Sequence, residues 1–346
     1  MRARYILPVC TLLLYLPFLT RTYYWDGVLF SLNIERVHRG EVPAAILFHP
    51  NHLLYSALGY VLYSALWACR IHLRALTVLQ LFNVSMSAAA GYALYGLAKR
   101  VTRSAALALF CWVLFTCGAT WWKFSTDADS YILSVLLIIW AVRFSTGDPP
   151  KIFATAVCHT LAMLFHELAI FVYAPVIAAI LLNPRQPIRK RIWTSILYCA
   201  GTGAAVAAAY LACYSQADRT AYPTLLKWIT SYASDSSFTH SFGQLVNSYL
   251  MSYVKLFAGG KLVFLGEYFS APVVLSLAIC IGALVTSIRL FRTRTLAQRQ
   301  STVVLWVWLL TSAFFLAIWD PGDVARFCQP VITEDFSTSA NSLGVR

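Results

Sequence analysis

Residues 21–52 read RTYYWDGVLFSLNIERVHRGEVPAAILFHPNH, a polar and aromatic stretch that directly follows the first long apolar segment. It contains Asp26 beside three aromatic residues and ends in a His-Pro-Asn-His sequence that begins at His49. Because the rest of the chain is mostly apolar, such a dense polar insert next to a membrane span is the expected place for chemistry. We interpret the remainder of the chain as a scaffold around it.

The composition is that of an integral membrane protein. Of 346 residues, 59% are hydrophobic and only 12% are charged, and the mean hydropathy is +0.66; these values are typical of chains with many membrane spans. The net charge of +13 lies largely in short loops between apolar runs, so it indicates topology and predicts no nucleic-acid partner. The nine cysteines form no CxxC pair, which predicts neither a disulfide framework nor a metal knuckle.

The apolar segments predict an all-α polytopic protein with about nine spans, since one crossing takes about 20 residues. The longest apolar windows are 5–20, 75–98, 104–121, 129–143, 192–213, 270–290 and 302–319. The first window resembles a secretory signal but has no small-residue cleavage site after it, so we expect a retained span. The region 152–182 lies between two basic loops and predicts two short helices with a turn at Phe165-His166-Glu167.

Basic residues in short loops predict the orientation, because they stay on the cytoplasmic side. The clusters are Arg2/Arg4, Lys99/Arg100/Arg103, Arg143/Lys151, Arg185/Arg189/Lys190/Arg191 and Arg289/Arg292/Arg294/Arg299. They place the N-terminus inside, and they leave 44–69 as a helix lying along the outer face within a first outer loop at 21–74. A crossing by 52–69 is the alternative. In this topology Asp148 is the one acidic residue of the 14 on the cytoplasmic side, and the outer stretch 214–268 predicts interfacial amphipathic helices.

Asp26 is the leading catalytic candidate, because an acid among aromatic residues is partly desolvated and can act as a general base. The alternative is a solvated loop residue. Asp127 and Asp129 lie between two spans, where an acid can cap a helix N-terminus. We expect Ser125, Thr126 or Asp127 to cap the helix that begins near Asp129. Capping is the better explanation for Asp127, whereas Asp129 would lie one turn in and could point toward the Asp26 loop.

Further polar residues predict a substrate site on the outer face. His166 and Glu167 lie at the predicted hairpin turn, where a charged pair is either interfacial or functional. His49 and His52 could share a helix face and bind phosphate or a metal, although no third ligand is evident. The outer cations Lys123 and Arg326 could meet a phosphate or extend to lipid headgroups.

Several of these features together resemble the GT-C polytopic glycosyltransferases, with the closest likeness to the protein O-mannosyltransferase-like and bacterial branches. The features are an acid in the first outer loop, the stretch FHPNHLLYSALGYVLY before the second span, the basic loop AKRVTR, the stretch DADSYILS and WDPGD near 319–323. The likeness covers residues 1–183 well and the remainder in outline. One first-loop acid replaces the pair common in that family, and Asn51-His52 replaces its usual turn.

The resemblance implies an inverting sugar transfer from a polyprenyl-phosphate-linked donor to a glycan, lipid or protein acceptor at the outer face. Asp26 would be the catalytic base, and Asp129 would hold the acceptor or a divalent metal ion. Tyr24 and Trp25 would line the sugar site, with Lys123, His49, His52, His166 and Glu167 as further substrate-binding residues. The implied location is the bacterial inner (plasma) membrane, in contact with membrane lipid.

The chain becomes polar after Asp320, which predicts a transmembrane module, 1–320, and a polar tail, 321–346. The resemblance implies further spans or a domain at this point and so suggests a truncated member. Two other functions fit the sequence. A transporter or flippase of lipid-linked sugars would need polar residues at mid-depth, for which Gln80, Asn83 and His159 are the main candidates. A non-catalytic membrane partner of a larger assembly is the other.

Overall fold

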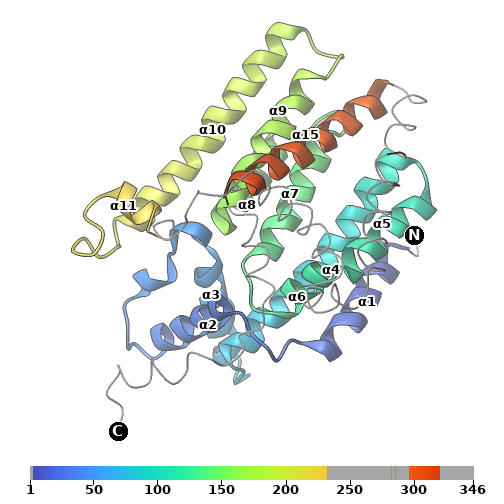
Figure 1. Cartoon of the computed structure of the whole chain (residues 1–346). Coiled ribbons are helices and arrows are strands. Elements are labelled where there is room, and N and C mark those ends of the chain that lie inside the picture. Colours follow the sequence, from blue (N-terminus) through green and yellow to red (C-terminus); the bar gives the residue numbers. More distant parts are fainter. Residues whose placement is uncertain (1–2, 232–281, 283–284, 286–295, 320–346) are drawn as a thin grey trace.

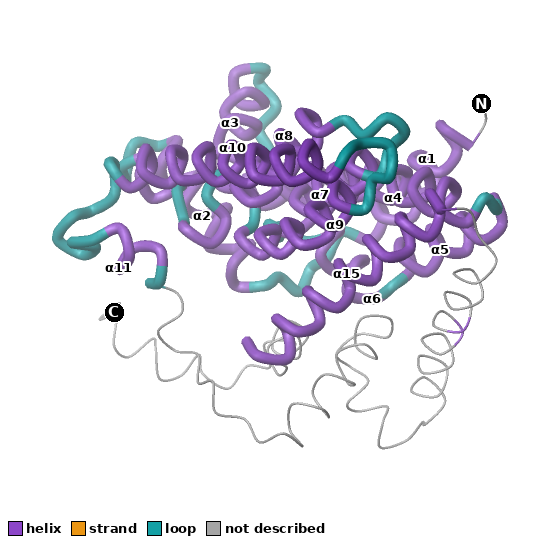
Figure 2. Tube along the Cα trace, turned by 90° about the horizontal axis from the view of Figure 1, so that it is seen from above, coloured by secondary structure: helices purple, strands orange, loops and turns teal. Residues whose placement is uncertain are grey.

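The protein is a bundle of helices. The computed structural model describes residues 3–231, 282, 285 and 296–319, and within these ranges there are α-helices and short 3-10 helices but no strand (Figures 1 and 2). The predicted all-helical class is therefore confirmed. The predicted span at 270–290, the tail at 321–346, the WDPGD stretch beyond Trp319 and most of 214–268 lie outside the described residues.

The first third of the chain forms one long helix, a shorter helix that packs along it, and an appended group of short helices. These are α1 (Ala3–Tyr15), η1 (Leu16–Phe18), α2 (Trp25–His38), η2 (Ala44–Leu47), η3 (Pro50–His52), α3 (Tyr55–Ala68) and α4 (Ala75–Thr102). The helices α2 and α3 pack against each other and against the start of α4. The sequence thus correctly predicts short helices within 21–74.

Helix α4 is the centre of the bundle, where it contacts α1, α2, α5 and α7. The buried face of α4 includes Ala88, Ala90, Gly91 and Ala93, whose small side chains let neighbouring helices approach closely. At Gly91 an added Cβ would lie 3.0 Å from the Trp112 ring nitrogen. These small residues make α4 the helix on which the others assemble.

The predicted span 104–121 is broken at Gly118. Helices α5 (Ala105–Cys117) and α6 (Ala119–Thr126) meet there at a bend of 60°. The Thr116 carbonyl, which would bond to the amide of residue 120 in a continuous helix, accepts a hydrogen bond of 2.6 Å from the Tyr15 hydroxyl of α1. A side chain from another helix therefore satisfies the last turn of α5, and Gly118 takes an extended conformation.

The second half of the bundle contains the predicted hairpin. Its elements are α7 (Tyr131–Ser145), α8 (Ile152–Phe165), η4 (Glu167–Val172), α9 (Tyr173–Leu181), α10 (Ile188–Tyr214), α11 (Leu225–Ile229) and α15 (Leu296–Trp319). Helix α8 ends at Phe165 and the chain turns at His166, so the turn predicted within 152–182 is confirmed. Helices α7, α8 and α10 lie next to one another in that order, and α9 packs against α15.

The two ends of the bundle differ in chemistry. The loop that joins α9 to α10 lies at one end, and α2 and α3 lie at the other (Figure 1). At the first end Arg100 donates to the Arg143 carbonyl at 2.9 Å, and Arg185 pairs with Asp148. The loops that the sequence assigns to the cytoplasmic side therefore come together.

Length and hydropathy identify fewer membrane-crossing helices than the sequence predicts. Within the described residues, α10 is long and apolar enough to cross a membrane by itself, and the bent pair of α5 and α6 would be a second crossing. Several other apolar helices, including α7 and α8, are shorter. The fold class is thus established as all-helical, whereas the number of spans stays a prediction.

Polar side chains of α4 hold the irregular segment between α6 and α7. The Asn83 amide nitrogen donates to the carbonyl oxygens of Asp127 at 2.8 Å and Asp129 at 2.7 Å. One turn earlier, Gln80 donates to the carbonyls of Thr20 and Thr126. Residues 127–130 are all buried, so these bonds satisfy backbone groups that water does not reach.

We predict that Asn83→Ala lowers the free energy of unfolding by about 1–3 kcal/mol, because it leaves buried carbonyls without a donor. The measurement is thermal unfolding in detergent micelles. Ser85→Ala is the matched control, since the exposed Ser85 hydroxyl bonds only to the Leu81 carbonyl of the same helix. Equal melting temperatures for the two variants would contradict this role of Asn83.

Candidate functional site

Asp26 lies in the first turn of α2, which is pressed against the segment between α6 and α7. A Cβ added to Gly27 would lie 2.6 Å from the Ala128 carbonyl oxygen, so only glycine permits this approach. The backbone amide of Tyr24 donates to Asp127 Oδ2 at 3.1 Å. These two contacts bring Asp26, Asp127 and Asp129 together at one end of the bundle.

Asp127 and Lys123 form an ion pair beneath this cluster. The Lys123 ammonium lies 2.8 Å from Asp127 Oδ2 and 3.0 Å from Thr20 Oγ1, and it also donates to the Thr22 carbonyl. Asp127 is fully buried, and its other oxygen accepts from the Ala128 amide at 2.8 Å. Lys123 was predicted to meet a phosphate, but its three donors are used to hold residues 20–24 and 127 together.

The expected position of Asp129 within a helix is wrong. Helix α7 begins at Tyr131, so Asp129 lies in the segment before it, and Asp127 ends α6 without capping α7. The reason is that Asn83 binds the carbonyls of residues 127 and 129 and holds this segment out of helical geometry. Asp129 nevertheless lies near enough to Asp26 for the Asp26 charge to raise the pKa of Asp129, after the larger effect of burial.

The two carboxyl groups have different environments. Asp26 is exposed on one side, and the protein around its carboxyl desolvates it enough to raise its pKa. Asp129 is 4% exposed, and burial together with the charges of Asp26 and Asp127 raises its pKa to about 8. Asp129 therefore carries a proton near neutral pH while Asp26 is available as the ionised partner. Such a separation of pKa values is typical of acid and base pairs.

Three histidines pack around the elements that carry this carboxyl pair. The rings of His49 and His52 stack at 4.5 Å, and Phe30 of α2 meets His52 edge-on at 4.4 Å. His166 stacks on Tyr131, the first residue of α7, at 4.2 Å. The Leu54 amide bonds to the Leu164 carbonyl and joins the first loop to the end of α8.

Burial keeps these imidazoles neutral. It lowers the pKa of His49 and of His52, and the nearby His49 and His166 lower that of His52 further. For His166, burial lowers the pKa to about 3. Nδ1 of His52 is buried and has no hydrogen-bond partner among the described residues. The histidines thus offer neutral hydrogen-bonding groups instead of cations.

The remaining predicted site residues lie around this cluster. Tyr24 packs on Phe124 and under the Lys123 ammonium, whereas Trp25 is 70% exposed on the outside of α2. Glu167 begins η4 directly after His166, at the end of the hairpin turn. Arg326 lies outside the described residues. Tyr24 therefore packs against the ion pair of Lys123 and Asp127, and Trp25 faces outward.

Tyr55 is a site residue that the sequence reasoning missed. Its buried hydroxyl accepts from Asn83 at 3.2 Å, and Asp129 lies close enough to raise its pKa further above the value that burial alone gives. The signal was available on α4, where Gln80, Asn83 and Ser87 form a polar stripe at helical spacing within an apolar helix. Such a stripe predicts polar partners on the neighbouring segments.

The carboxyl cluster does not make a metal site from the described residues alone. Within the described ranges, no three His, Cys, Asp or Glu side chains come close enough to hold an ion. Asp129 bonds through its carbonyl to Asn83, and Asp127 is neutralised by Lys123.

The comparisons with known proteins give no relative. No family model, curated protein or solved structure shows significant similarity to this chain.

We predict that the substitution Asp129→Asn changes stability more favourably at pH 8 than at pH 5. Because the folded pKa of Asp129 is raised to about 8, the folded state holds a proton that the unfolded state loses above about pH 4. Stability therefore falls as pH rises through this window, by up to about 1.4 kcal/mol per pH unit. The asparagine variant lacks this loss, and its melting temperature should decline less between pH 5 and pH 8.

The control for this measurement is Asp148→Asn at the opposite end of the bundle, where the side chain is 62% exposed. It should follow the pH dependence of the unsubstituted protein. If the melting temperature of Asp129→Asn changes with pH as it does in the unsubstituted protein and in Asp148→Asn, Asp129 is not held protonated.

Proposed function

We propose that the protein is a membrane glycosyltransferase that moves a sugar from a polyprenyl-phosphate-linked donor to an acceptor at the outer face. The observation that carries the proposal is the exposed Asp26 placed near the buried Asp129, whose pKa is raised to about 8 by burial and by the charges of Asp26 and Asp127. An exposed base near a buried acid suits proton removal from a hydroxyl. The GT-C resemblance supplies the donor class.

The proposal places the protein in a membrane, with about nine spans and a cytoplasmic N-terminus as the sequence predicts. The exposed surface supports the membrane location. Helix α10 exposes large apolar residues along its length, including Trp193, Leu197 and Leu211, and α1 exposes Leu13. Water-soluble proteins rarely expose such continuous apolar surface. Lipid is the solvent that fits it.

The spacing of polar features along α4 also fits a bilayer. Asn83 lies at the carboxyl cluster and Arg100 at the basic end, which are about 26 Å apart along a helix. The apolar layer of a bilayer is about 30 Å thick. The two polar ends of the bundle would therefore lie at opposite membrane surfaces.

The contacts of α3 favour its placement outside this layer. Tyr55 meets Asn83, and Gly59 packs against Leu79, so α3 runs along the first turns of α4 and away from the basic end. Arg74 pairs with Glu35 of α2 at 2.8 Å. Burial alone would raise the pKa of Glu35, but hydrogen bonds from Arg74 and the Ala75 amide lower it. This supports the outer helix over a crossing at 52–69.

The proposed reaction uses Asp26 as the general base. Its carboxylate takes the proton of an acceptor hydroxyl while the hydroxyl oxygen bonds to C1 of the sugar, and the bond from C1 to the phosphate oxygen breaks. Attack opposite the leaving phosphate inverts the anomeric carbon. Asp129, protonated near neutral pH, would donate a hydrogen bond to the substrate or to Asp26. Polyprenyl phosphate leaves as an anion.

The flippase alternative is less well supported by the polar residues at mid-depth. Nε2 of His159 meets the Ala169 carbonyl at 2.8 Å, and its Nδ1 meets the Tyr198 hydroxyl at 2.5 Å. Gln80 and Asn83 bind backbone carbonyls. These side chains serve helix contacts, so within the described part of the chain they do not favour a polar path across the membrane.

We predict that Asp26→Asn lowers sugar transfer from a labelled polyprenyl-phosphate donor by about 10²–10⁴-fold, the usual contribution of a general base. Since the base must be ionised, activity of the unsubstituted protein should fall as pH drops toward the raised pKa of Asp26. Glu41→Gln, at an exposed position in the same loop, is the control and should retain transfer. Normal transfer by Asp26→Asn would favour the flippase or the non-catalytic partner.

A further inference from the structure

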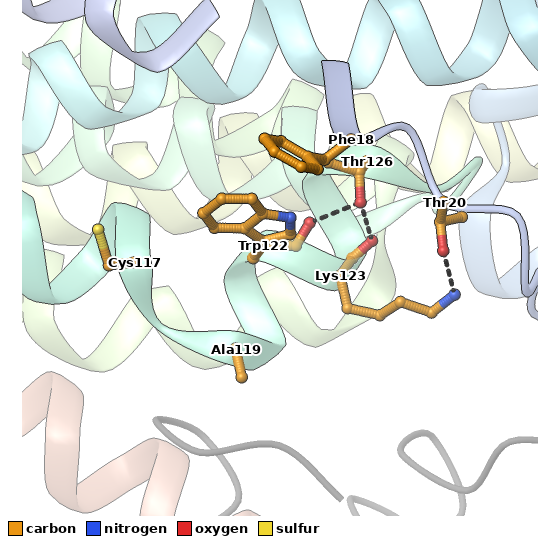
Figure 3. A pocket seen from close by; sticks show the side chains of 7 residues that line it. All are labelled: Phe18, Thr20, Cys117, Ala119, Trp122, Lys123 and Thr126. Carbon is orange, nitrogen blue, oxygen red and sulfur yellow. Dashed lines mark hydrogen bonds between the residues drawn. The ribbon is translucent and has the colours of Figure 1, made fainter. Parts of the chain in front are cut away.

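An open hollow of about 360 Å³ lies beside the carboxyl cluster, between η1 and the bend that joins α5 to α6 (Figure 3). Its lining includes Phe18, Thr20, Cys117, Ala119, Trp122 and Lys123. The bend of 60° at Gly118 creates the hollow, because in a continuous helix α6 would extend straight along the axis of α5. The proposed reaction assigns no role to this hollow.

The hollow is apolar along most of its length and polar at one end. The rings of Phe18 and Trp122 lie 6.0 Å apart and form a wall, and Thr20 and the Lys123 ammonium lie together away from Cys117 (Figure 3). The Lys123 charge is offset by the buried Asp127 at 2.8 Å. The hollow therefore suits an uncharged hydrocarbon chain that meets polar groups at one end.

The hollow runs from the level of the site toward the basic end of the bundle. Its polar end is level with Gln80, which binds the Thr20 carbonyl. Its far end, at Cys117, adjoins Thr116, which packs against Gly91. Gln80 and Gly91 are about 16 Å apart along α4. In the proposed membrane orientation, an occupant would enter at the outer surface and extend into the apolar layer.

The polar end of the hollow is joined to the Asp26 segment by one ammonium group. Lys123 binds the Thr22 carbonyl and lies 4.6 Å from the centre of the Tyr24 ring. Tyr24 immediately precedes α2, in whose first turn Asp26 lies. A chain that leaves the hollow at Lys123 would therefore place its head group beside the proposed base.

We propose that this hollow binds the first isoprene units of the lipid-linked donor, next to its phosphate. This proposal rests on the proposed function for its ligand class. At about 30 Å³ for each water-sized group, the hollow takes roughly a dozen non-hydrogen atoms, or about two isoprene units. The site would thereby fix the depth of the donor and the distance between its sugar and Asp26.

The test uses the full chain in lipid nanodiscs and a polyprenyl phosphate with a photoreactive diazirine on its second isoprene unit. After illumination, mass spectrometry should find adducts concentrated in residues 117–126 and at Phe18. Unlabelled polyprenyl phosphate should reduce them at least tenfold, and the same amount of phosphatidylglycerol should not. Adducts spread over all apolar helices, or equal competition by phosphatidylglycerol, would overturn the proposal.

Two variants test the hollow itself. Ala119→Trp should fill the hollow and reduce the adducts at least tenfold. Cys117→Trp, at the end away from Lys123, should do the same. Ala106→Trp, at an exposed position of α5 away from the hollow, should leave them unchanged. Full labelling of both filled variants would exclude this site.

The experiment also separates this proposal from the proposed function. Labelling needs no sugar transfer, so Asp26→Asn should be labelled as strongly as the unsubstituted protein. If labelling is as expected but Asp26→Asn transfers sugar normally, the lipid site stands and the role of Asp26 fails. If transfer depends on Asp26 but the hollow is not labelled, the lipid site fails alone.

Discussion

The contact between the first turn of α2 and the Ala128 backbone determines where Asp26 lies. Without a side chain at Gly27 the two backbones approach so closely that a Cβ would lie 2.6 Å from the Ala128 oxygen. The segment it meets is itself fixed, because Asn83 binds the carbonyls on both sides of Ala128. The start of α2 thus has one defined position, with its acid near a second acid.

The chemistry of the site follows from unequal burial at this contact. Asp127 is buried but paired with Lys123, so its charge is balanced. Asp129 is buried beside two acids, and its pKa is raised to about 8. Asp26 remains exposed. Three aspartates therefore have three different environments, which are set by their neighbours in the fold and not by the sequence around them.

The sequence predicts much of the fold and less of the site. Apolar windows locate most described helices, and the basic loops predict which ends come together, because both signals are local. The break at Gly118 depends on Tyr15, which is 101 residues from the carbonyl it binds, so no local pattern predicts it. The role of Lys123 likewise depends on Thr20 and Thr22, which approach only in the folded chain. The pairing of Asp26 with Asp129 was predictable from topology, but their separate protonation states needed burial.

The most direct test of the account compares Gly27→Ala with Gly201→Ala, a glycine of α10 with open space around it. The account predicts that Gly27→Ala displaces α2, lowers the melting temperature and reduces sugar transfer at least tenfold, because small displacements of a catalytic group are costly. Gly201→Ala should leave transfer unchanged and should not lower the melting temperature, because alanine favours a helix interior over glycine. Equal stability and equal transfer in the two variants would contradict the claim that this backbone contact positions Asp26.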